Sequence, residues 1–186
     1  MHDVEGIASG TDSRNAEMIA KLVKGSNFRR AADYVLRAGK PAPQVALIGG
    51  NMVGKDGRSL AAEFRAGREL RPDVPRPVWH AMLALAPQQS LTTDAWTRAV
   101  RTFMSEMGLN PDRHQWCLVL HKDTRHEHVH ILASRISVID GLLAREMRGD
   151  FRISHKAAAV AAAEVGLAPV VSRRYGPSKR PWVARC

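Results

Sequence analysis

The sequence predicts an α+β fold in which helices flank a central, largely antiparallel sheet, and three observations lead to this prediction. The length of 186 residues suits one domain with a true hydrophobic core. Short apolar runs interleave along the chain with segments of helical periodicity. Two runs with strand-like alternation, at 116–123 and 126–133, leave only Thr124 and Arg125 as a short connection, and a hairpin between them makes the sheet at least partly antiparallel.

The first half of the predicted domain contains two strand–helix pairs. They follow a polar leader at residues 1–17, which we expect to be disordered. An apolar run at 18–23 predicts the first strand, and Ser26 or Asn27 is suited to cap a helix at 28–37. The second pair is a strand at 44–48 and a basic helix at 59–70.

The second half continues with a strand, a helix, the hairpin and a last helix. The run at 78–85 alternates weakly and predicts a strand. Thr92 or Thr93 is suited to cap a helix at 94–107. After the hairpin come an alanine-rich helix at 157–165 and a basic tail at 171–186, so the folded domain is expected to span 18–170.

Basic residues exceed acidic ones by 28 to 18, which gives the chain a formal net charge of +10. Such an excess attracts polyanions, and phosphate contacts are the natural expectation. Because a soluble protein can be basic without binding nucleic acid, the grouping of these residues carries more weight than their number. The grouping favours a surface along which a nucleic-acid backbone runs. The residues that we select as DNA contacts are Arg29, Arg30, Arg37, Arg65 and Arg68.

The cysteine count and the first residues favour a cytoplasmic protein. Two cysteines are too few for a disulfide framework. The stretch at 1–16 lacks the basic start and apolar run of a signal peptide, and no run of about twenty apolar residues predicts a membrane helix.

Four of the eight histidines lie between residues 121 and 130. Alternate residues of a strand share a face, so His126, His128 and His130 are expected to project together, with His121 and Asp123 across a hairpin. Three neutral imidazoles with an open coordination position form a catalytic metal site, and we predict His121, His128 and His130 as the ligands. Asp123 is the candidate to orient an imidazole or to accept a proton. His126 is expected to support a ligand or to contact DNA.

Two other interpretations of this cluster are weaker. A chance cluster of histidines on the protein surface is disfavoured. Val129, Ile131 and Ala133 alternate with the histidines, which indicates a packed strand. A structural zinc site usually recruits cysteine and closes at four protein ligands, whereas only Cys117 lies nearby. By ligand type alone, imidazoles suit zinc, nickel, manganese or copper.

The order of several segments resembles the relaxase/mobilisation nuclease family, the HUH endonucleases that nick DNA for conjugative transfer. The resemblance covers residues 18–170, and its metal motif is the most specific part. The segments concerned are 28–36, similar to the first motif with its nucleophilic tyrosine, 77–83, similar to the middle strand, 121–130, similar to the metal motif, and 151–167, similar to the helix that follows.

The resemblance implies an enzyme that makes a site- and strand-specific nick at an origin of transfer, in plasmid mobilisation or conjugation. It selects Tyr34 over Tyr175, the other tyrosine, as the nucleophile that stays on the 5′ phosphate. The implied metal is Mg²⁺ or Mn²⁺, with Zn²⁺ or Ni²⁺ left open by the ligand type. The implied partners in a bacterial cytoplasm are single-stranded DNA, accessory relaxosome proteins and a coupling protein. Members of the family often continue into a further carboxy-terminal region. The resemblance therefore leaves open whether this chain is a fragment of a longer relaxase.

Two positions depart from the family pattern. Ser134 stands where the family often has Asn, four positions after the last metal histidine, which affects a supporting hydrogen bond. Ala84 follows the middle strand where the family commonly places a DNA-contacting serine, so Ser90 becomes the candidate for that contact.

Two rival functions remain open. A rolling-circle replication initiator or a transposase of the HUH class would use the same chemistry, but its tyrosine typically follows the histidine segment, whereas Tyr34 precedes it. A non-catalytic, metal-stabilised DNA-binding module would keep the histidines and the basic charge without cutting DNA.

Overall fold

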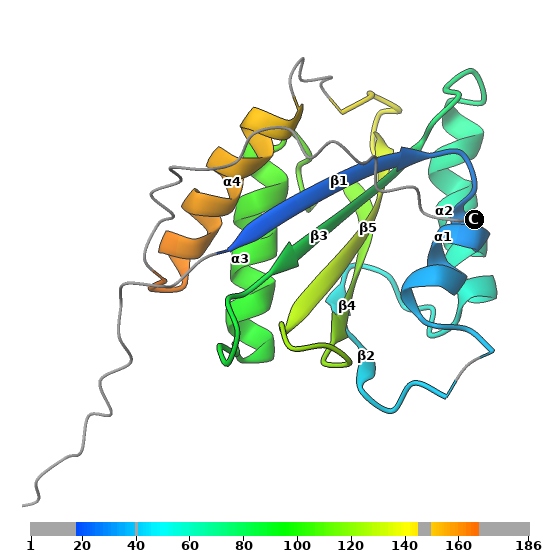
Figure 1. Ribbon diagram of the computed structural model, residues 1–186. Coiled ribbons are helices and arrows are strands. Elements are labelled where there is room, and N and C mark those ends of the chain that lie inside the picture. Colours follow the sequence, from blue (N-terminus) through cyan, green and yellow to red (C-terminus); the bar gives the residue numbers. More distant parts are fainter. Residues whose placement is uncertain (1–17, 40, 145–149, 168–186) are drawn as a thin grey trace, which may run out of the picture.

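The structure, a computed structural model, describes residues 18–39, 41–144 and 150–167; the predicted leader at 1–17 and tail at 171–186 therefore lie outside the described residues. The described strands form one sheet in the order β1-β3-β5-β4-β2, and every neighbouring pair is antiparallel (Figure 1). The strands are β1 (Ile19–Gly25), β2 (Val45–Gly50), β3 (Val78–Ala84), β4 (His114–His121) and β5 (His128–Ser137). The helices are α1 (Phe28–Val35), α2 (Gly57–Leu70), α3 (Thr93–Glu106) and α4 (Asp150–Glu164). The predicted α+β class with a central antiparallel sheet is confirmed.

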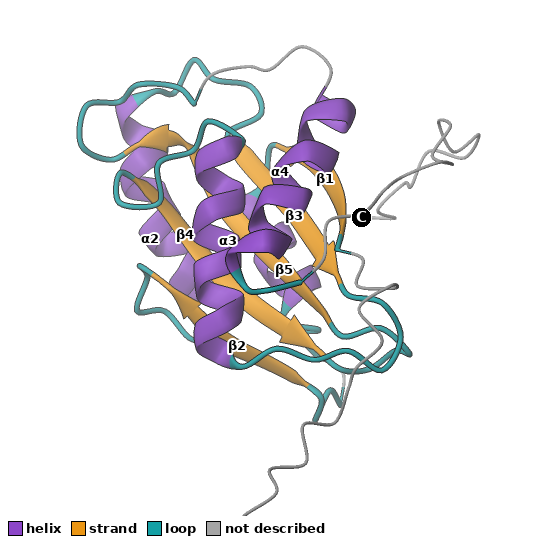
Figure 2. Cartoon of the chain, turned by 90° about the vertical axis from the view of Figure 1, so that its left-hand side faces the viewer, coloured by secondary structure: helices purple, strands orange, loops and turns teal. Residues whose placement is uncertain are grey.

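Helices cover both faces of this sheet, and on each face they pack over a separate apolar core. Figure 2 shows α3 and α4 side by side across one face, where Trp96 and Phe103 of α3 are fully buried. On the opposite face, α1 and α2 bury a smaller core, in which the rings of Phe28 and Phe64 stack with centroids 4.3 Å apart. None of the described helices is long and apolar enough to cross a membrane.

Most element boundaries are close to the predicted ones, and the N-caps of α1 and α3 fall on predicted residues. Asn27 caps α1 by accepting from the Arg30 amide at 2.9 Å, and Thr92 caps α3. Helix α1 ends at Val35 rather than at residue 37, because Arg37 adopts a φ of 55°, outside the helical region. Helix α4 begins well before the predicted start at 157.

The β4–β5 hairpin differs from the prediction in its connection. We expected Thr124 and Arg125 alone to join the strands, but the connection runs from 122 to 127. His126 therefore precedes β5 instead of sharing its face, and Asp123 lies in the connection rather than across from β5. The Thr124 hydroxyl donates to the His126 carbonyl oxygen at 2.9 Å, a local bond that competes with strand pairing.

Glu127 holds this connection against α3. Its carboxylate is buried and accepts from the Leu91 amide at 3.0 Å and from the Trp96 indole N–H at 2.8 Å, while Lys122 Nζ lies 3.0 Å away. Burial raises the pKa of Glu127, but the hydrogen bonds from Leu91 and Trp96 and the Lys122 ammonium outweigh it and hold that pKa below its usual value. The start of β5, and with it His128, is thereby tied to the larger core.

Replacing Glu127 by Ala should lower the free energy of unfolding by about 2 kcal/mol, because the Leu91 amide and the buried Trp96 indole N–H lose a charged acceptor. Urea denaturation followed by tryptophan fluorescence measures this change. The control is Glu106→Ala at the exposed end of α3, which should change stability little. Equal stability of the two variants would show that Glu127 does not anchor the hairpin.

Candidate metal centre

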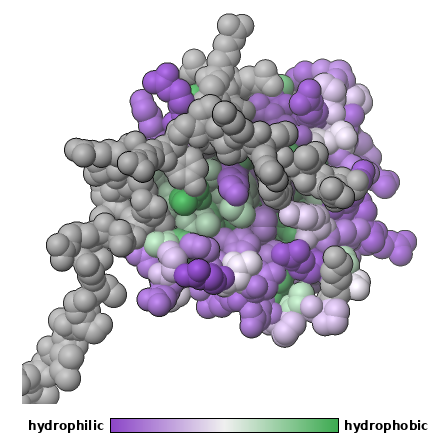
Figure 3. Space-filling model, in the orientation of Figure 1, coloured by the Kyte–Doolittle hydropathy of each residue, from purple (hydrophilic) through white to green (hydrophobic). Residues whose placement is uncertain are grey.

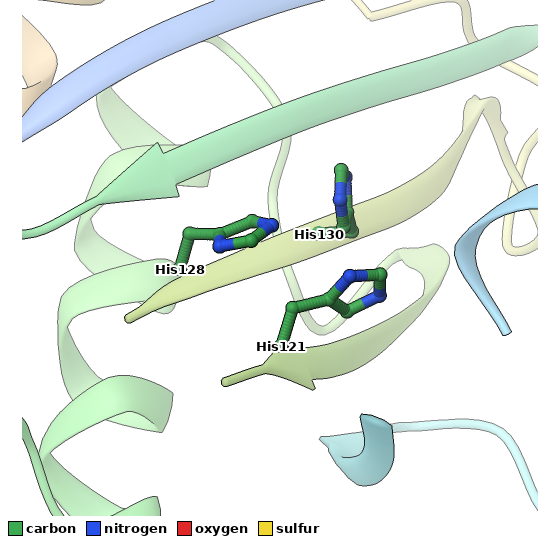
Figure 4. Close-up of side chains that lie close together, drawn as sticks. All are labelled: His121, His128 and His130. Atoms are coloured by element: carbon green, nitrogen blue, oxygen red, sulfur yellow. The ribbon is translucent and has the colours of Figure 1, made fainter. Parts of the chain in front are cut away.

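Three histidines gather where β4 ends and β5 begins. Strand register sets His121 opposite His128 and Val119 opposite His130, so the three imidazoles share the sheet face that α1 and α2 cover. Figure 4 shows His121, His128 and His130 projecting from the two strands into the same space. Each can direct one ring nitrogen to a common point, with these atoms within 4.8 Å of one another, and all three residues are buried.

Hydrogen bonds at the opposite ring nitrogens determine which nitrogens are free. His121 Nε2 lies 2.7 Å from the Val35 carbonyl oxygen, and His128 Nδ1 lies 3.0 Å from that of His126. A carbonyl oxygen only accepts, so these two nitrogens carry the protons and leave lone pairs on His121 Nδ1 and His128 Nε2. His121 Nδ1 is buried and makes no hydrogen bond, as expected for a ligand atom.

Burial favours the neutral, metal-binding form of two of these imidazoles, His130 and His121. Burial lowers the pKa of His130 to about 2, with further lowering by the neighbouring His80 and His121, and burial also lowers the pKa of His121. Neutral imidazoles at neutral pH have lone pairs available for a cation. The donor set therefore fits a divalent metal ion; it does not distinguish among manganese, zinc and nickel.

Helix α1 brings Tyr34 to this centre. The Tyr34 ring is approached edge-on by His80, with centroids 5.9 Å apart, and by His130, with centroids 6.1 Å apart. Val35, whose carbonyl accepts from His121, is the next residue and the last of the helix. The predicted nucleophile and the predicted metal ligands thus lie in one place, although they are far apart in the sequence.

Asp123 and Arg37 form an ion pair at the edge of the centre. Arg37 Nη2 donates to Asp123 Oδ2 at 3.0 Å, and Asp123 Oδ1 lies 3.8 Å from His121 Nδ1. Both side chains are about one-third exposed. Arg37, which the sequence analysis selects as a DNA contact, thus has an acidic partner beside the predicted metal ligands.

The other predicted supporting residues are in three different environments. Ser134 is fully buried farther along β5, where its hydroxyl accepts from the Ile136 amide at 3.1 Å. Ser90 is exposed in the loop after β3. His126 contributes its main-chain carbonyl to His128, while its own Nδ1 lies 3.0 Å from the Leu85 carbonyl oxygen. The structure therefore supports a role for the main chain of His126.

The five predicted DNA-binding arginines are in different environments. Arg30 and Arg65 are exposed. Arg29 pairs with Asp33 at 2.7 Å within α1. Arg68 donates to the Arg71 and Val74 carbonyl oxygens, both at 2.8 Å, and thus closes the end of α2. Arg68 is in this way a structural residue, in addition to any contact it makes with a phosphate.

The sequence analysis missed His80, which lies on β3 beside the cluster. Its Nε2 is 2.9 Å from His130 Nδ1, and burial lowers its pKa to about 4. The signal was present, because alternation places His80 between Val78 and Met82 on one face of a mostly buried strand. To link this strand to the histidine hairpin, the sequence analysis would have needed the strand order, which alternation does not reveal.

Most of the chain matches the model of a known protein family. The family model described as "Relaxase: MobA/VirD2-like, nuclease domain" matches residues 34–167. The matched segment begins at Tyr34, includes the three histidines of the cluster and reaches the end of α4. No curated protein matches the chain.

Replacing His128 by Ala should weaken Mn²⁺ binding by at least about tenfold, because one of three nitrogen ligands is lost. Isothermal titration of the DNA-free protein with MnCl₂ measures the affinity. The matched control is His126→Ala, which keeps the carbonyl that orients His128 and should bind Mn²⁺ as the parent does. Equal affinity of the parent and the His128 variant would remove His128 from the ligand set.

Proposed function

The chain belongs to the relaxase family, with a MobA/VirD2-like nuclease domain, and from this membership we propose that it nicks one DNA strand at a defined site and stays covalently linked to it through Tyr34. The observation that carries the proposal is the position of Tyr34 beside the buried histidine cluster. A phenol next to three grouped imidazoles has the two groups that metal-assisted phosphoryl transfer needs, a nucleophile and a cation site.

In the proposed reaction the Tyr34 oxygen attacks the phosphorus of one phosphodiester and forms a new P–O bond. The bond between phosphorus and the 3′ oxygen breaks, and the phenol's proton ends on that oxygen, which gives a 3′ hydroxyl and a 5′-phosphotyrosyl linkage. A divalent cation at His121, His128 and His130 would offset negative charge on a non-bridging phosphate oxygen. One phosphoester replaces another, so the bond energy is retained for rejoining.

Two contacts support the placement of the nucleophile. The Val35 carbonyl accepts from His121, and Arg37 pairs with Asp123, so the residues just after Tyr34 are bound to the hairpin that carries the histidines. Positioning of this kind lowers the barrier because the reacting groups need little reorganisation. We further propose that Asp123 accepts the phenol's proton or orients His121, since its carboxylate lies beside that imidazole.

The charge of the molecule favours a nucleic-acid substrate. A net charge of +10 attracts phosphate, and Arg30 and Arg65 are exposed on the helices α1 and α2 that cover the site's face of the sheet. Figure 3 shows hydrophilic side chains predominating around the rim of the face drawn there. We propose that single-stranded DNA at an origin of transfer is the substrate, in plasmid mobilisation within a bacterial cytoplasm, with accessory relaxosome proteins and a coupling protein as partners.

Replacing Tyr34 by Phe should abolish covalent attachment to DNA and leave Mn²⁺ affinity unchanged, because only the attacking oxygen is removed. The assay incubates the protein with Mn²⁺ and a supercoiled plasmid that carries the cognate origin, then resolves protein-linked nicked circles after denaturation. Tyr175→Phe, at the other tyrosine of the chain, is the matched control and should keep attachment.

Each outcome of this assay separates the candidate functions. Attachment that persists in the Tyr34 variant would rule out Tyr34 as the nucleophile. A parent protein that binds the origin and Mn²⁺ but never nicks it would instead be a metal-stabilised DNA-binding module. Nicking at a replication origin rather than an origin of transfer would indicate a rolling-circle initiator.

Replacing Asp123 by Asn keeps the shape of the side chain and removes its charge. If Asp123 accepts the proton of Tyr34, single-turnover nicking at saturating Mn²⁺ should slow by about 100-fold or more. Mn²⁺ affinity, measured by titration calorimetry, should fall far less than in the His128 variant. An unchanged nicking rate would leave Asp123 with no function beyond its ion pair with Arg37.

A further inference from the structure

His80 is a buried polar residue in the middle of β3 to which the proposed reaction assigns no role. It is 9% exposed, and its strand neighbours on either side, Trp79 and Ala81, are also buried. Strand β3 pairs with β5 on one side and with β1 on the other, so His80 faces the cluster from a strand that contributes none of the three predicted ligands. A buried imidazole costs free energy unless its ring nitrogens are hydrogen-bonded.

The geometry joins His80 directly to one predicted metal ligand. His80 Nε2 and His130 Nδ1 are 2.9 Å apart, and the ring centroids are 5.0 Å apart. The Tyr34 ring contacts both imidazoles edge-on, so the pair lies next to the proposed nucleophile. His80 thus belongs to the centre without being one of the three grouped nitrogen donors.

The direction of the His80–His130 hydrogen bond decides whether His130 can bind a metal. Each neutral imidazole carries one N–H, so one ring donates and the other accepts. If His80 donated, the proton of His130 would sit on Nε2, and that nitrogen would have no lone pair to offer. If His130 donates through Nδ1, its Nε2 is free for the cation and His80 Nε2 must be the acceptor.

His130 differs in this respect from the other two predicted ligands. His121 and His128 donate to main-chain carbonyl oxygens, which are acceptors whatever the side chains around them. The orientation and tautomer of His130 depend instead on a second side chain, which can itself exist as either tautomer. Whether His130 can bind a metal therefore depends on which residue occupies position 80 on another strand.

We propose that His80 is a positioning residue that accepts the Nδ1 proton of His130 and so fixes the tautomer and ring plane that present His130 Nε2 to the metal. This inference rests on the proposed metal centre, and it adds to that centre a fourth histidine that binds no metal. The role of His80 requires a neutral hydrogen-bond acceptor at the position of its Nε2. A side chain that fills the same space without an acceptor cannot perform this role.

Two substitutions test the proposal. His80→Leu replaces the imidazole by an apolar side chain of similar size and removes the acceptor, whereas His80→Gln places an amide oxygen where Nε2 lies. Calorimetric titration of the DNA-free protein with MnCl₂ should show affinity reduced 10- to 100-fold in the Leu variant and largely restored in the Gln variant. His114→Leu is the matched control, since His114 is a buried strand histidine bonded to the Ser134 carbonyl, and it should bind Mn²⁺ like the parent.

A second readout separates positioning from a general loss of structure. The Mn²⁺ concentration for half-maximal nicking should rise in His80→Leu by the same factor as the dissociation constant, while nicking at saturating Mn²⁺ stays near that of the parent. Circular dichroism of each variant checks that the fold is retained. A Leu variant that fails to fold leaves the Gln variant as the test, since the proposal requires it to fold and to bind Mn²⁺.

The outcomes distinguish this inference from the proposed function. Parental Mn²⁺ affinity in His80→Leu, or equal losses in the folded Leu and Gln variants, would overturn the role of His80 while leaving Tyr34-dependent nicking intact. A parent whose Mn²⁺ affinity depends on His80 but which does not nick DNA would overturn the nuclease function and retain the positioning role. A parent that binds no Mn²⁺ would overturn both.

Discussion

The pairing of His121 with His128 across β4 and β5 is the interaction on which the rest of the candidate site depends. This register turns both imidazoles, and His130 two positions farther along, to the face that α1 covers. A slip of one residue would turn the histidines of the slipped strand toward α3 and α4, where the core is apolar. The apolar residues that alternate with the histidines, Val129 and Ile131, fill that core and therefore penalise the slip.

The end of α1 depends on the same hairpin. Val35 closes the helix, and its carbonyl is bonded to His121, so the hydrogen bond that sets the free nitrogen of a predicted ligand also positions the segment that carries Tyr34. The Arg37–Asp123 pair adds a second contact between the two segments, at the more exposed edge. Placement of the nucleophile and preparation of the metal ligands are thus consequences of one set of contacts. The Glu127 carboxylate extends this arrangement to the opposite face by binding the indole of Trp96.

Neutral imidazoles are the chemical condition for the centre, and burial supplies it. The sheet, α1 and the hairpin remove His130 and His121 from water, which disfavours their charged forms. Burial alone does not choose between the two tautomers of a neutral ring, so each ligand also needs a partner for its second nitrogen. Main-chain carbonyls are those partners for two ligands, and His80 is in the position to be the partner of the third.

The sequence by itself determined the elements, the α+β class and the grouping of His121, His128 and His130, because hydrophobic periodicity and strand alternation are local properties of the chain. It did not determine where β3 lies, and so it missed His80, which meets His130 only because β3 pairs with β5. It also placed His126 on the strand, whereas a hydrogen bond within the loop holds that residue outside β5, and it did not reveal the ion pair between Arg37 and Asp123. Strand order, loop path and ion pairing are set by contacts between distant segments, and only the tertiary structure decides which of many such contacts form together.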